Sequence, residues 1–221
     1  MVVQIVVWVL PVLFAITLHE AAHGYAAMFF GDTTAKEYGR LSLNPIRHID
    51  LTGTVIVPFI LIISSSPFLF GWAKPVPINP AKLNSPKRNM VWVAAAGPLI
   101  NLILAFFSSW ALSLALLLPN YVSSLASDML RNSLLINVIL FVFNMIPLPP
   151  LDGGRIAVGL LPHRVAAVLA SFEKYGMFVI IGLLLVLPLI LSGFGFSFSP
   201  FEMFLWPLIN WVIGIILIFK V

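Results

Sequence analysis

Two histidines and a glutamate at a spacing suited to metal chemistry lie in the first apolar stretch of the chain. The sequence reads His19-Glu20-Ala-Ala-His23. A helix brings residues i and i+4 onto one face, so both imidazoles can bind the same ion. Glu20 then lies where it can take a proton from a water molecule on that ion. Zinc suits this chemistry because it lowers the pKa of its bound water to about 7 and polarises a carbonyl under attack.

The alternative is that these three residues only pack a helix and form hydrogen bonds to its neighbours. Ionisable groups inside a membrane helix are costly, and such groups usually serve a function. Three of them fall within five residues here, so we favour the metal site.

A zinc site also needs a third protein ligand. We predict that Asp152 is this ligand, because it follows Pro147, Pro149 and Pro150, where a span must stop being helical. Irregular backbone at membrane depth must be buried in protein or line a wet cavity, so this stretch is expected to form a wall of the site. Two alternatives for Asp152 are an N-cap for the following helix and an ion pair with Arg155. The remaining histidines and acidic residues lie in predicted loops.

The composition indicates the elements that must position these residues. Hydrophobic residues make up 61% of the 221 residues and charged residues 9%, against about 25% charged in soluble domains. We therefore expect an all-α polytopic membrane protein with five to six transmembrane helices, forming a single domain over 1–221. The net charge of +4 is too small and scattered to indicate a nucleic-acid partner. The predicted spans are approximately 2–30, 90–118, 132–147, 176–192 and 203–219.

A further apolar run, 53–70, contains Pro58 and Pro67 and is predicted to re-enter the membrane without crossing it. With this topology and an outer N-terminus, eleven of the twelve Lys and Arg residues lie on the inner side, and only Arg131 lies outside. If 53–70 crossed fully, the better orientation would place eight inside. The positive-inside rule therefore favours re-entry.

The same topology brings the candidate ligands together. With 53–70 re-entrant, the first span and the 132–147 span run in the same direction. The histidine pair and Asp152 then both lie near the inner face, where one zinc ion can bind them. If 53–70 crossed, they would lie at opposite faces.

These motifs resemble the site-2 protease family of intramembrane zinc metalloproteases. The histidine helix is similar to that family's first motif, and the stretch from Asn144 through Pro147 to Asp152 and Gly153 is similar to its second. The segments 39–50, 72–77 and 96–101 resemble the short branch of the family, which lacks a PDZ module and a nucleotide-sensing domain.

The resemblance implies that His19, His23 and Asp152 bind one Zn²⁺ ion per chain and that Glu20 is the general base. It also implies that Asn144 helps to hold the substrate or the oxyanion. Without the resemblance, the Asn144 side chain would be expected to form a hydrogen bond between two helices. The implied activity is hydrolysis of peptide bonds in or near transmembrane segments of other membrane proteins. The lipid bilayer surrounds such an enzyme, here expected in the cell membrane of a prokaryote with its active site nearer the cytoplasmic face.

Two other functions fit some of these features. A catalytically silent membrane scaffold would have no need of Glu20. A divalent-metal transporter would usually show broken helices in corresponding halves, and the sequence has no such repeat. Both therefore rank below the protease.

Overall fold

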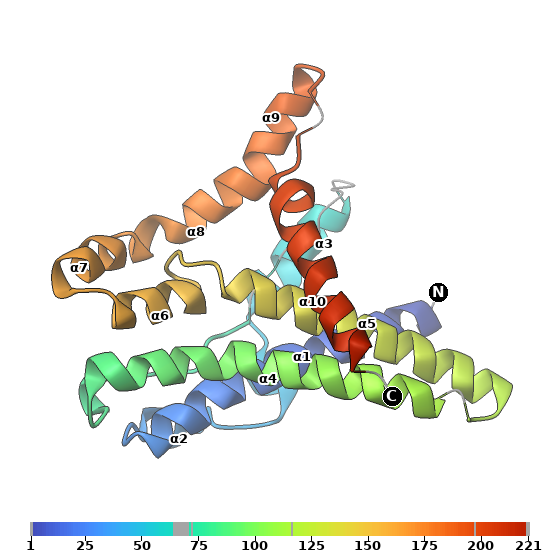
Figure 1. Cartoon of the computed structure of the whole chain (residues 1–221), viewed down its shortest axis with the longest axis horizontal. Coiled ribbons are helices and arrows are strands. Elements are labelled where there is room, and N and C mark those ends of the chain that lie inside the picture. The colour runs from blue at the N-terminus through green and yellow to red at the C-terminus, as the bar shows by residue number, and fades with distance from the viewer. Residues whose placement is uncertain (1, 64–70, 72, 116, 197, 220–221) are drawn as a thin grey trace.

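The structure is a computed structural model, and it describes residues 2–63, 71, 73–115, 117–196 and 198–219. All regular elements within these residues are helical, which confirms the predicted all-α class (Figure 1). Backbone polar groups satisfy one another inside a helix, so helices are the elements expected of apolar segments in a bilayer.

The chain begins with a long helix, α1 (Val2–Phe29). Five short elements follow it: α2 (Thr34–Glu37), the 3-10 turn η1 (Pro45–His48), the π-helical turn η2 (Leu51–Ile56), α3 (Val57–Ile63) and the 3-10 turn η3 (Pro80–Lys82). The side chains of Asn44 and Asn79 begin η1 and η3 by accepting a hydrogen bond from the backbone N–H two residues on. A proline next to each asparagine has its φ already suited to the turn.

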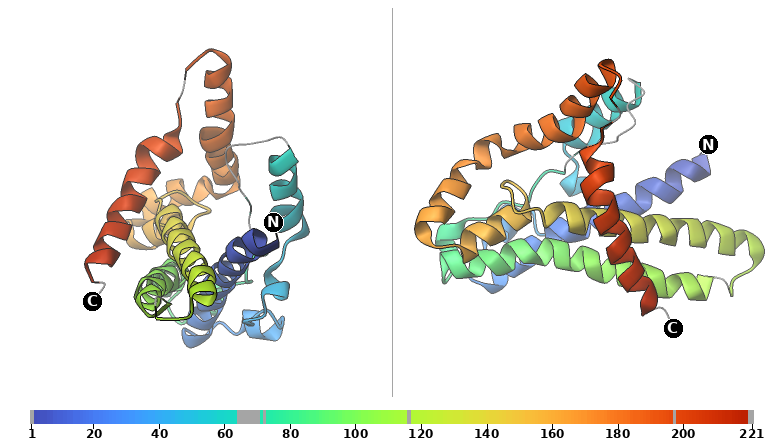
Figure 2. Two further views of the ribbon diagram at one scale, coloured as in Figure 1. Left: turned by 90° about the vertical axis from the view of Figure 1, so that its right-hand side faces the viewer. Right: turned by 45° about the horizontal axis from the view of Figure 1, so that its top comes forward.

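Two long helices, α4 (Pro86–Ala115) and α5 (Asn120–Asn144), form the centre of the molecule together with α1. In Figures 1 and 2, α1 and α5 run in the same direction and α4 runs opposite to both. This parallel course of α1 and α5 is the one that the predicted topology requires.

The remainder of the chain turns back along the bundle and then extends away from it (Figure 1). Its elements are α6 (Asp152–Leu160), α7 (His163–Ser171), α8 (Glu173–Ile181), the π-helical turn η4 (Gly182–Val186), α9 (Leu187–Gly193), the π-helical turn η5 (Phe201–Leu205) and α10 (Trp206–Ile218). Helix α6 packs against α4, and α10 packs against α5 and α4. The apolar core shared by α4, α5 and α10 contains Ala105, Leu134, Val138, Val142, Ile209, Val212 and Ile216.

Five helices in the described part of the chain are long and apolar enough to cross a membrane: Val6–Phe29, Pro86–Ala115, Asn120–Asn144, Glu173–Gly193 and Phe201–Ile218. This agrees with the predicted number. The start of the third predicted span, 132–147, was wrong, because helix α5 begins twelve residues earlier, at Asn120. The charged residues Asp128 and Arg131 suggested a loop. Both belong to the helix, and their side chains are exposed on its surface.

The predicted re-entrant segment 53–70 lies partly outside the described residues, since 64–70 are not described. Its described part, together with Leu51 and Thr52, forms η2 and α3, which end at Ile63. These helical residues are not among the five candidate spans. Re-entry itself therefore stays a prediction.

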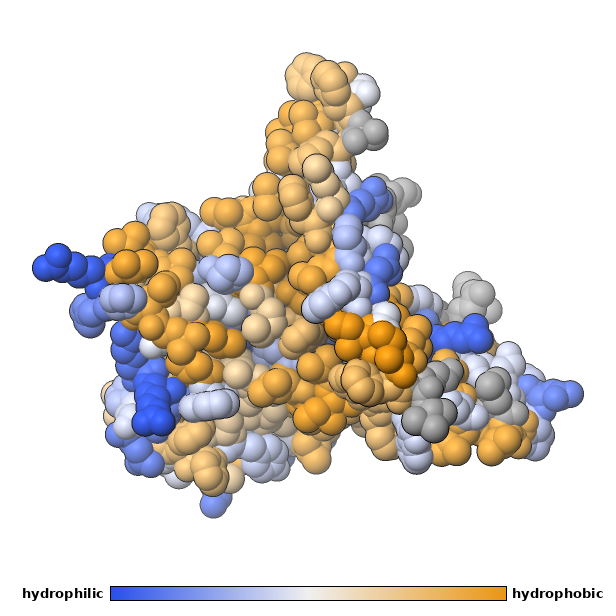
Figure 3. Space-filling model, in the orientation of Figure 1, coloured by the Kyte–Doolittle hydropathy of each residue, from blue (hydrophilic) through white to orange (hydrophobic). Residues whose placement is uncertain are grey.

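Many large hydrophobic side chains are exposed on the described part of the chain. In Figure 3, hydrophobic residues cover much of the visible face, including the protruding α8 and α9, and hydrophilic residues gather at the end where α4 begins. A surface of this kind suits contact with lipid more than with water.

Candidate metal centre

The histidine pair lies on one face of α1, one helical turn apart, as the sequence predicts. The Nε2 atoms of His19 and His23 are 3.0 Å apart, and each residue is 7% exposed. The two rings therefore point their outer nitrogens at a single place inside the protein.

Asp152 reaches the same place from the first turn of α6. Its Oδ2 atom lies 3.1 Å from Nε2 of His19 and 3.3 Å from Nε2 of His23. Neither alternative for Asp152 occurs, since Leu151 holds the N-cap position and Arg155 pairs with Glu173 at 3.2 Å.

Two glycines let the start of α6 lie against the turn that follows α5. A Cβ atom at Gly153 would lie 2.4 Å from the Met145 carbonyl oxygen, and one at Gly154 would lie 2.1 Å from the Pro149 backbone nitrogen. Real side chains do not approach backbone this closely. The Asp-Gly-Gly sequence therefore supplies both the candidate ligand Asp152 and the close packing that aims it at α1.

The inner nitrogens of both imidazoles contact α4. His19 Nδ1 lies 2.6 Å from Oδ1 of Asn101, and His23 Nδ1 lies 2.7 Å from the Val93 carbonyl oxygen. Because a carbonyl oxygen only accepts, each Nδ1 carries a hydrogen, and in the neutral ring Nε2 then has the lone pair that can bind a metal ion. Such contacts orient metal-binding histidines and raise their basicity.

Asn101 is itself held by two further hydrogen bonds. It is 0% exposed, and its Nδ2 donates to Asn137 Oδ1 at 2.8 Å and to the Ala15 carbonyl oxygen at 3.3 Å. The sequence singled out Asn101 only as part of a family-like segment and gave it no chemical role. A buried asparagine on a membrane helix was the available signal, but nothing in the sequence paired it with His19.

Gly97 makes room for the histidine rings on α4. A Cβ atom at this position would lie 2.4 Å from Nε2 of His23 and 2.7 Å from Cε1 of His19. Any side chain here would occupy the space of the rings. The sequence alone did not indicate this role, because a glycine beside Pro98 in an apolar helix has several common explanations.

The three converging atoms fit a metal ion. Two imidazole lone pairs and a carboxylate oxygen lie 3.0–3.3 Å apart, and Oδ2 of Asp152 is buried and forms no hydrogen bond. With both rings neutral, three lone pairs face one another here, and a cation between them would relieve their repulsion. Zinc–ligand bonds of about 2.0–2.2 Å in a tetrahedron place neighbouring ligand atoms about 3.3 Å apart. The donor set therefore fits zinc.

Glu20 lies beside this group and is half-buried. Its Oε2 atom accepts a hydrogen bond from the backbone N–H of Val76 at 2.8 Å. Asn144, the last residue of α5, is half-buried and donates from Nδ2 to the carbonyl oxygen of Leu140 at 3.0 Å, within its own helix. This is not the interhelical bond considered from the residue alone, and the predicted role of Asn144 in substrate binding stays a prediction.

The other candidate acidic residues do not join the cluster. In the described part of the chain, the group of three or more metal-binding side chains consists of His19, His23 and Asp152. Asp32 serves the fold. It is fully buried and accepts hydrogen bonds from the backbone N–H of Thr34 at 3.0 Å and of Asn79 at 2.6 Å. Burial by itself raises the pKa of Asp32, but the hydrogen bonds from Thr34 and Asn79 outweigh it and hold the pKa below its usual value.

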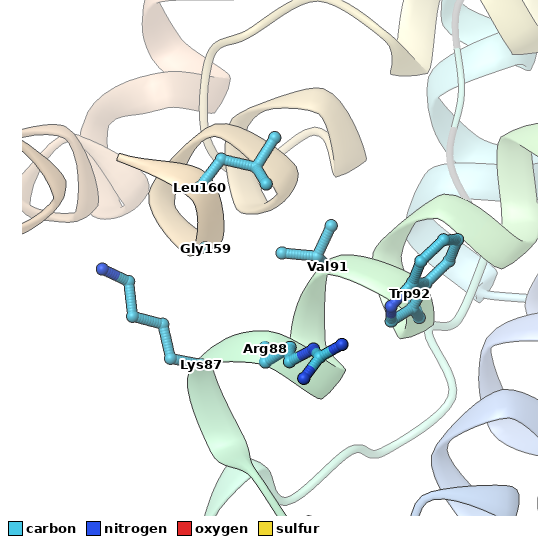
Figure 4. A pocket seen from close by; sticks show the side chains of 6 residues that line it. All are labelled: Lys87, Arg88, Val91, Trp92, Gly159 and Leu160. Atoms are coloured by element: carbon cyan, nitrogen blue, oxygen red, sulfur yellow. The ribbon is translucent and has the colours of Figure 1, made fainter. Parts of the chain in front are cut away.

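A surface pocket of about 380 Å³ lies between the start of α4 and the end of α6 (Figure 4). Its lining residues are Lys87, Arg88, Val91, Trp92, Gly159 and Leu160, and none of them belongs to the metal centre. The Lys87 ammonium group donates to the Leu161 carbonyl oxygen at 2.7 Å and so ties the two helices together.

Comparison with known proteins gives matches over most of the chain. The model of a family described as Peptidase family M50 matches residues 120–187, which contain Asp152 but not the histidine pair. "Putative zinc metalloprotease YwhC" of Bacillus subtilis is 38% identical over 206 residues, covering 91% of this chain and 85% of the relative. "Putative zinc metalloprotease Rip2" of Mycolicibacterium smegmatis is 28% identical over 174 residues, covering 78% of this chain and 64% of the relative. The search of solved structures found no significant match.

Proposed function

Because the chain belongs to Peptidase family M50, the family of the site-2 proteases that its motifs resemble, we propose that it is an intramembrane zinc metalloprotease. We further propose that its substrates are transmembrane segments of other membrane proteins. The observation that carries the proposal is the buried convergence of His19, His23 and Asp152 on one point, with Glu20 in the same helical turn.

The residues divide the chemical work as follows. His19, His23 and Asp152 would hold the metal, and the contacts of the two histidines with α4 fix their rings before any substrate arrives. Zinc bound by these residues would supply a water of lowered pKa and a positive charge that polarises the peptide carbonyl. Glu20 takes a proton as the water oxygen attacks the carbonyl carbon, and it delivers a proton to the leaving amine as the C–N bond breaks.

The location of the site explains why membrane segments are the proposed substrates. The candidate ligands lie between α1, α4 and α6 in a bundle that exposes many large hydrophobic side chains. A substrate helix hides its carbonyl groups in its own hydrogen bonds, so it must unwind locally before it can be cut. The cell membrane of a prokaryote and a site nearer the cytoplasmic face remain part of this proposal.

The first experiment measures metal and cleavage in the same set of proteins. We expect about one zinc ion per chain in the wild type and in Glu20→Gln, and a loss of most zinc in Asp152→Ala. Glu202→Gln is the matched control for Glu20→Gln, because Glu202 is exposed and lies in η5.

Cleavage is then measured without assuming a substrate. Membranes containing each variant are incubated, and new N-termini within transmembrane segments are labelled and identified. We expect such termini with the wild type and with Glu202→Gln, and none with Glu20→Gln or Asp152→Ala. A different outcome would favour a transporter: the wild type cleaves nothing, and Glu20→Gln moves zinc into vesicles.

A further inference from the structure

The segment 73–79, which has no regular secondary structure, contacts α1 at Val76 and supplies the hydrogen bond to Glu20. Val76 is 5% exposed, and its backbone N–H points at Oε2 of Glu20 over 2.8 Å. The residues on either side, Pro75 and Pro77, have no backbone N–H. Val76 therefore carries the one main-chain donor of this Pro-Val-Pro sequence, and that donor goes to the predicted general base.

Two contacts fix the segment immediately before Val76. The Arg40 guanidinium group donates to the carbonyl oxygens of Lys74 at 2.9 Å and Pro75 at 3.5 Å, and it also donates to the carbonyl oxygen of Arg47. The Lys74 N–H donates to the His48 carbonyl oxygen at 2.9 Å. Arg40 thus ties the 39–48 loop to the 73–79 segment, one residue away from the donor.

We propose that the Val76 amide is a positioning group for Glu20 and that Arg40 holds this amide in place. This inference rests on the proposed function, since it assigns a role in the same reaction. The hydrogen bond from Val76 to Oε2 restricts the orientation of the carboxylate, and Oε1 is left to accept the proton. A free glutamate side chain would have to give up several rotamers to reach that geometry.

Hydrogen–deuterium exchange tests the contact without any need for activity or zinc. Because Pro75 and Pro77 carry no amide hydrogen, the exchange rate across 75–77 reports Val76 alone. In metal-free protein, Glu20→Ala should speed this exchange about tenfold or more, because the acceptor is gone. Glu20→Gln keeps a side-chain oxygen as acceptor and should remain close to the wild-type rate. An unchanged rate in Glu20→Ala would overturn the proposal.

A second experiment removes the donor and keeps the side chain. Replacing Val76 by α-hydroxyisovaleric acid turns its N–H into an ester oxygen. The matched control is the same type of change at Ile78, whose N–H donates no hydrogen bond to the described part of the chain. With a substrate found in the membrane experiment, the Val76 ester should lower kcat about tenfold to a hundredfold, the range for a hydrogen bond to a charged group. KM and zinc content should stay at wild-type values, as should kcat of the Ile78 ester.

The results separate this inference from the function on which it rests. A Val76 ester with unchanged or raised kcat would overturn it, since the amide would then be idle or would restrain the base. A wild type that cuts nothing would refute the proposed function, and the exchange measurement would still decide the Val76–Glu20 contact. Arg40→Gln should speed exchange at Val76 and lower kcat, and Arg40→Lys, which keeps one donor, should restore part of both. If Arg40→Gln had the wild-type exchange rate at Val76 and the wild-type kcat, Arg40 would have no role in holding the Val76 amide.

Discussion

Replacement of Gly97 by alanine should disrupt the metal centre by adding a single methyl group. The new Cβ atom would lie 2.4 Å from Nε2 of His23 and 2.7 Å from Cε1 of His19. An ordinary carbon contact needs about 3.5 Å or more, so the rings or α4 must move by about 1 Å. Metal sites tolerate deviations of only about 0.2 Å in their ligand distances.

The cost follows from the contacts that this movement breaks. Rotating the rings away from Gly97 would separate His19 from Asn101 and His23 from the Val93 carbonyl oxygen. Each buried polar group left without a partner costs about 1–3 kcal/mol, so the two together cost about 2–6 kcal/mol. At about 1.4 kcal/mol per factor of ten, the dissociation constant for zinc should rise at least about thirtyfold.

The assay is competitive zinc titration of the purified protein, with thermal unfolding followed in the presence and absence of zinc. Gly214→Ala is the matched control, because Gly214 lies within α10 and an added Cβ atom would meet no described heavy atom within 4 Å. We expect Gly214→Ala to bind zinc like the wild type. If Gly97→Ala also bound zinc with wild-type affinity, the closeness of α4 to the rings would not be a requirement of the site.

Three further predictions concern the surroundings of the site and the fold. Asn101→Leu should weaken zinc binding about 10- to 100-fold by leaving Nδ1 of His19 without its partner, whereas the exposed Asn210→Leu should not. Asp32→Asn should lower the melting temperature at pH 7, and the difference from the wild type should shrink as the pH falls below about 4. The sign follows from the lowered pKa of Asp32, because the ionised carboxylate stabilises the fold above its ordinary pKa and this contribution is lost on protonation. Chelation of zinc should lower the melting temperature of the wild type and have little effect on Asp152→Ala, and equal responses would exclude Asp152 as a ligand.

Local patterns in the sequence were sufficient for the all-α class, the number of spans and the histidine pair. Apolar runs of about 20 residues must form helices in a bilayer, and i,i+4 spacing puts His19 and His23 on one face wherever the helix lies. The start of α5 at Asn120 could not be predicted from such local patterns. Hydropathy marks the apolar part of a span, whereas helical hydrogen bonding continues through exposed polar residues such as Asp128.

The sequence also predicted that Asp152 lies near the histidines, because the charge distribution favoured a topology in which α1 and α5 are parallel. It did not predict Gly97, Asn101 or the Val76 amide, which contact the site from α4 and from the 73–79 segment. Their roles depend on how closely two segments distant in sequence approach each other, and on where one backbone N–H points. Such distances arise from the packing of whole helices, so only the tertiary structure decided them.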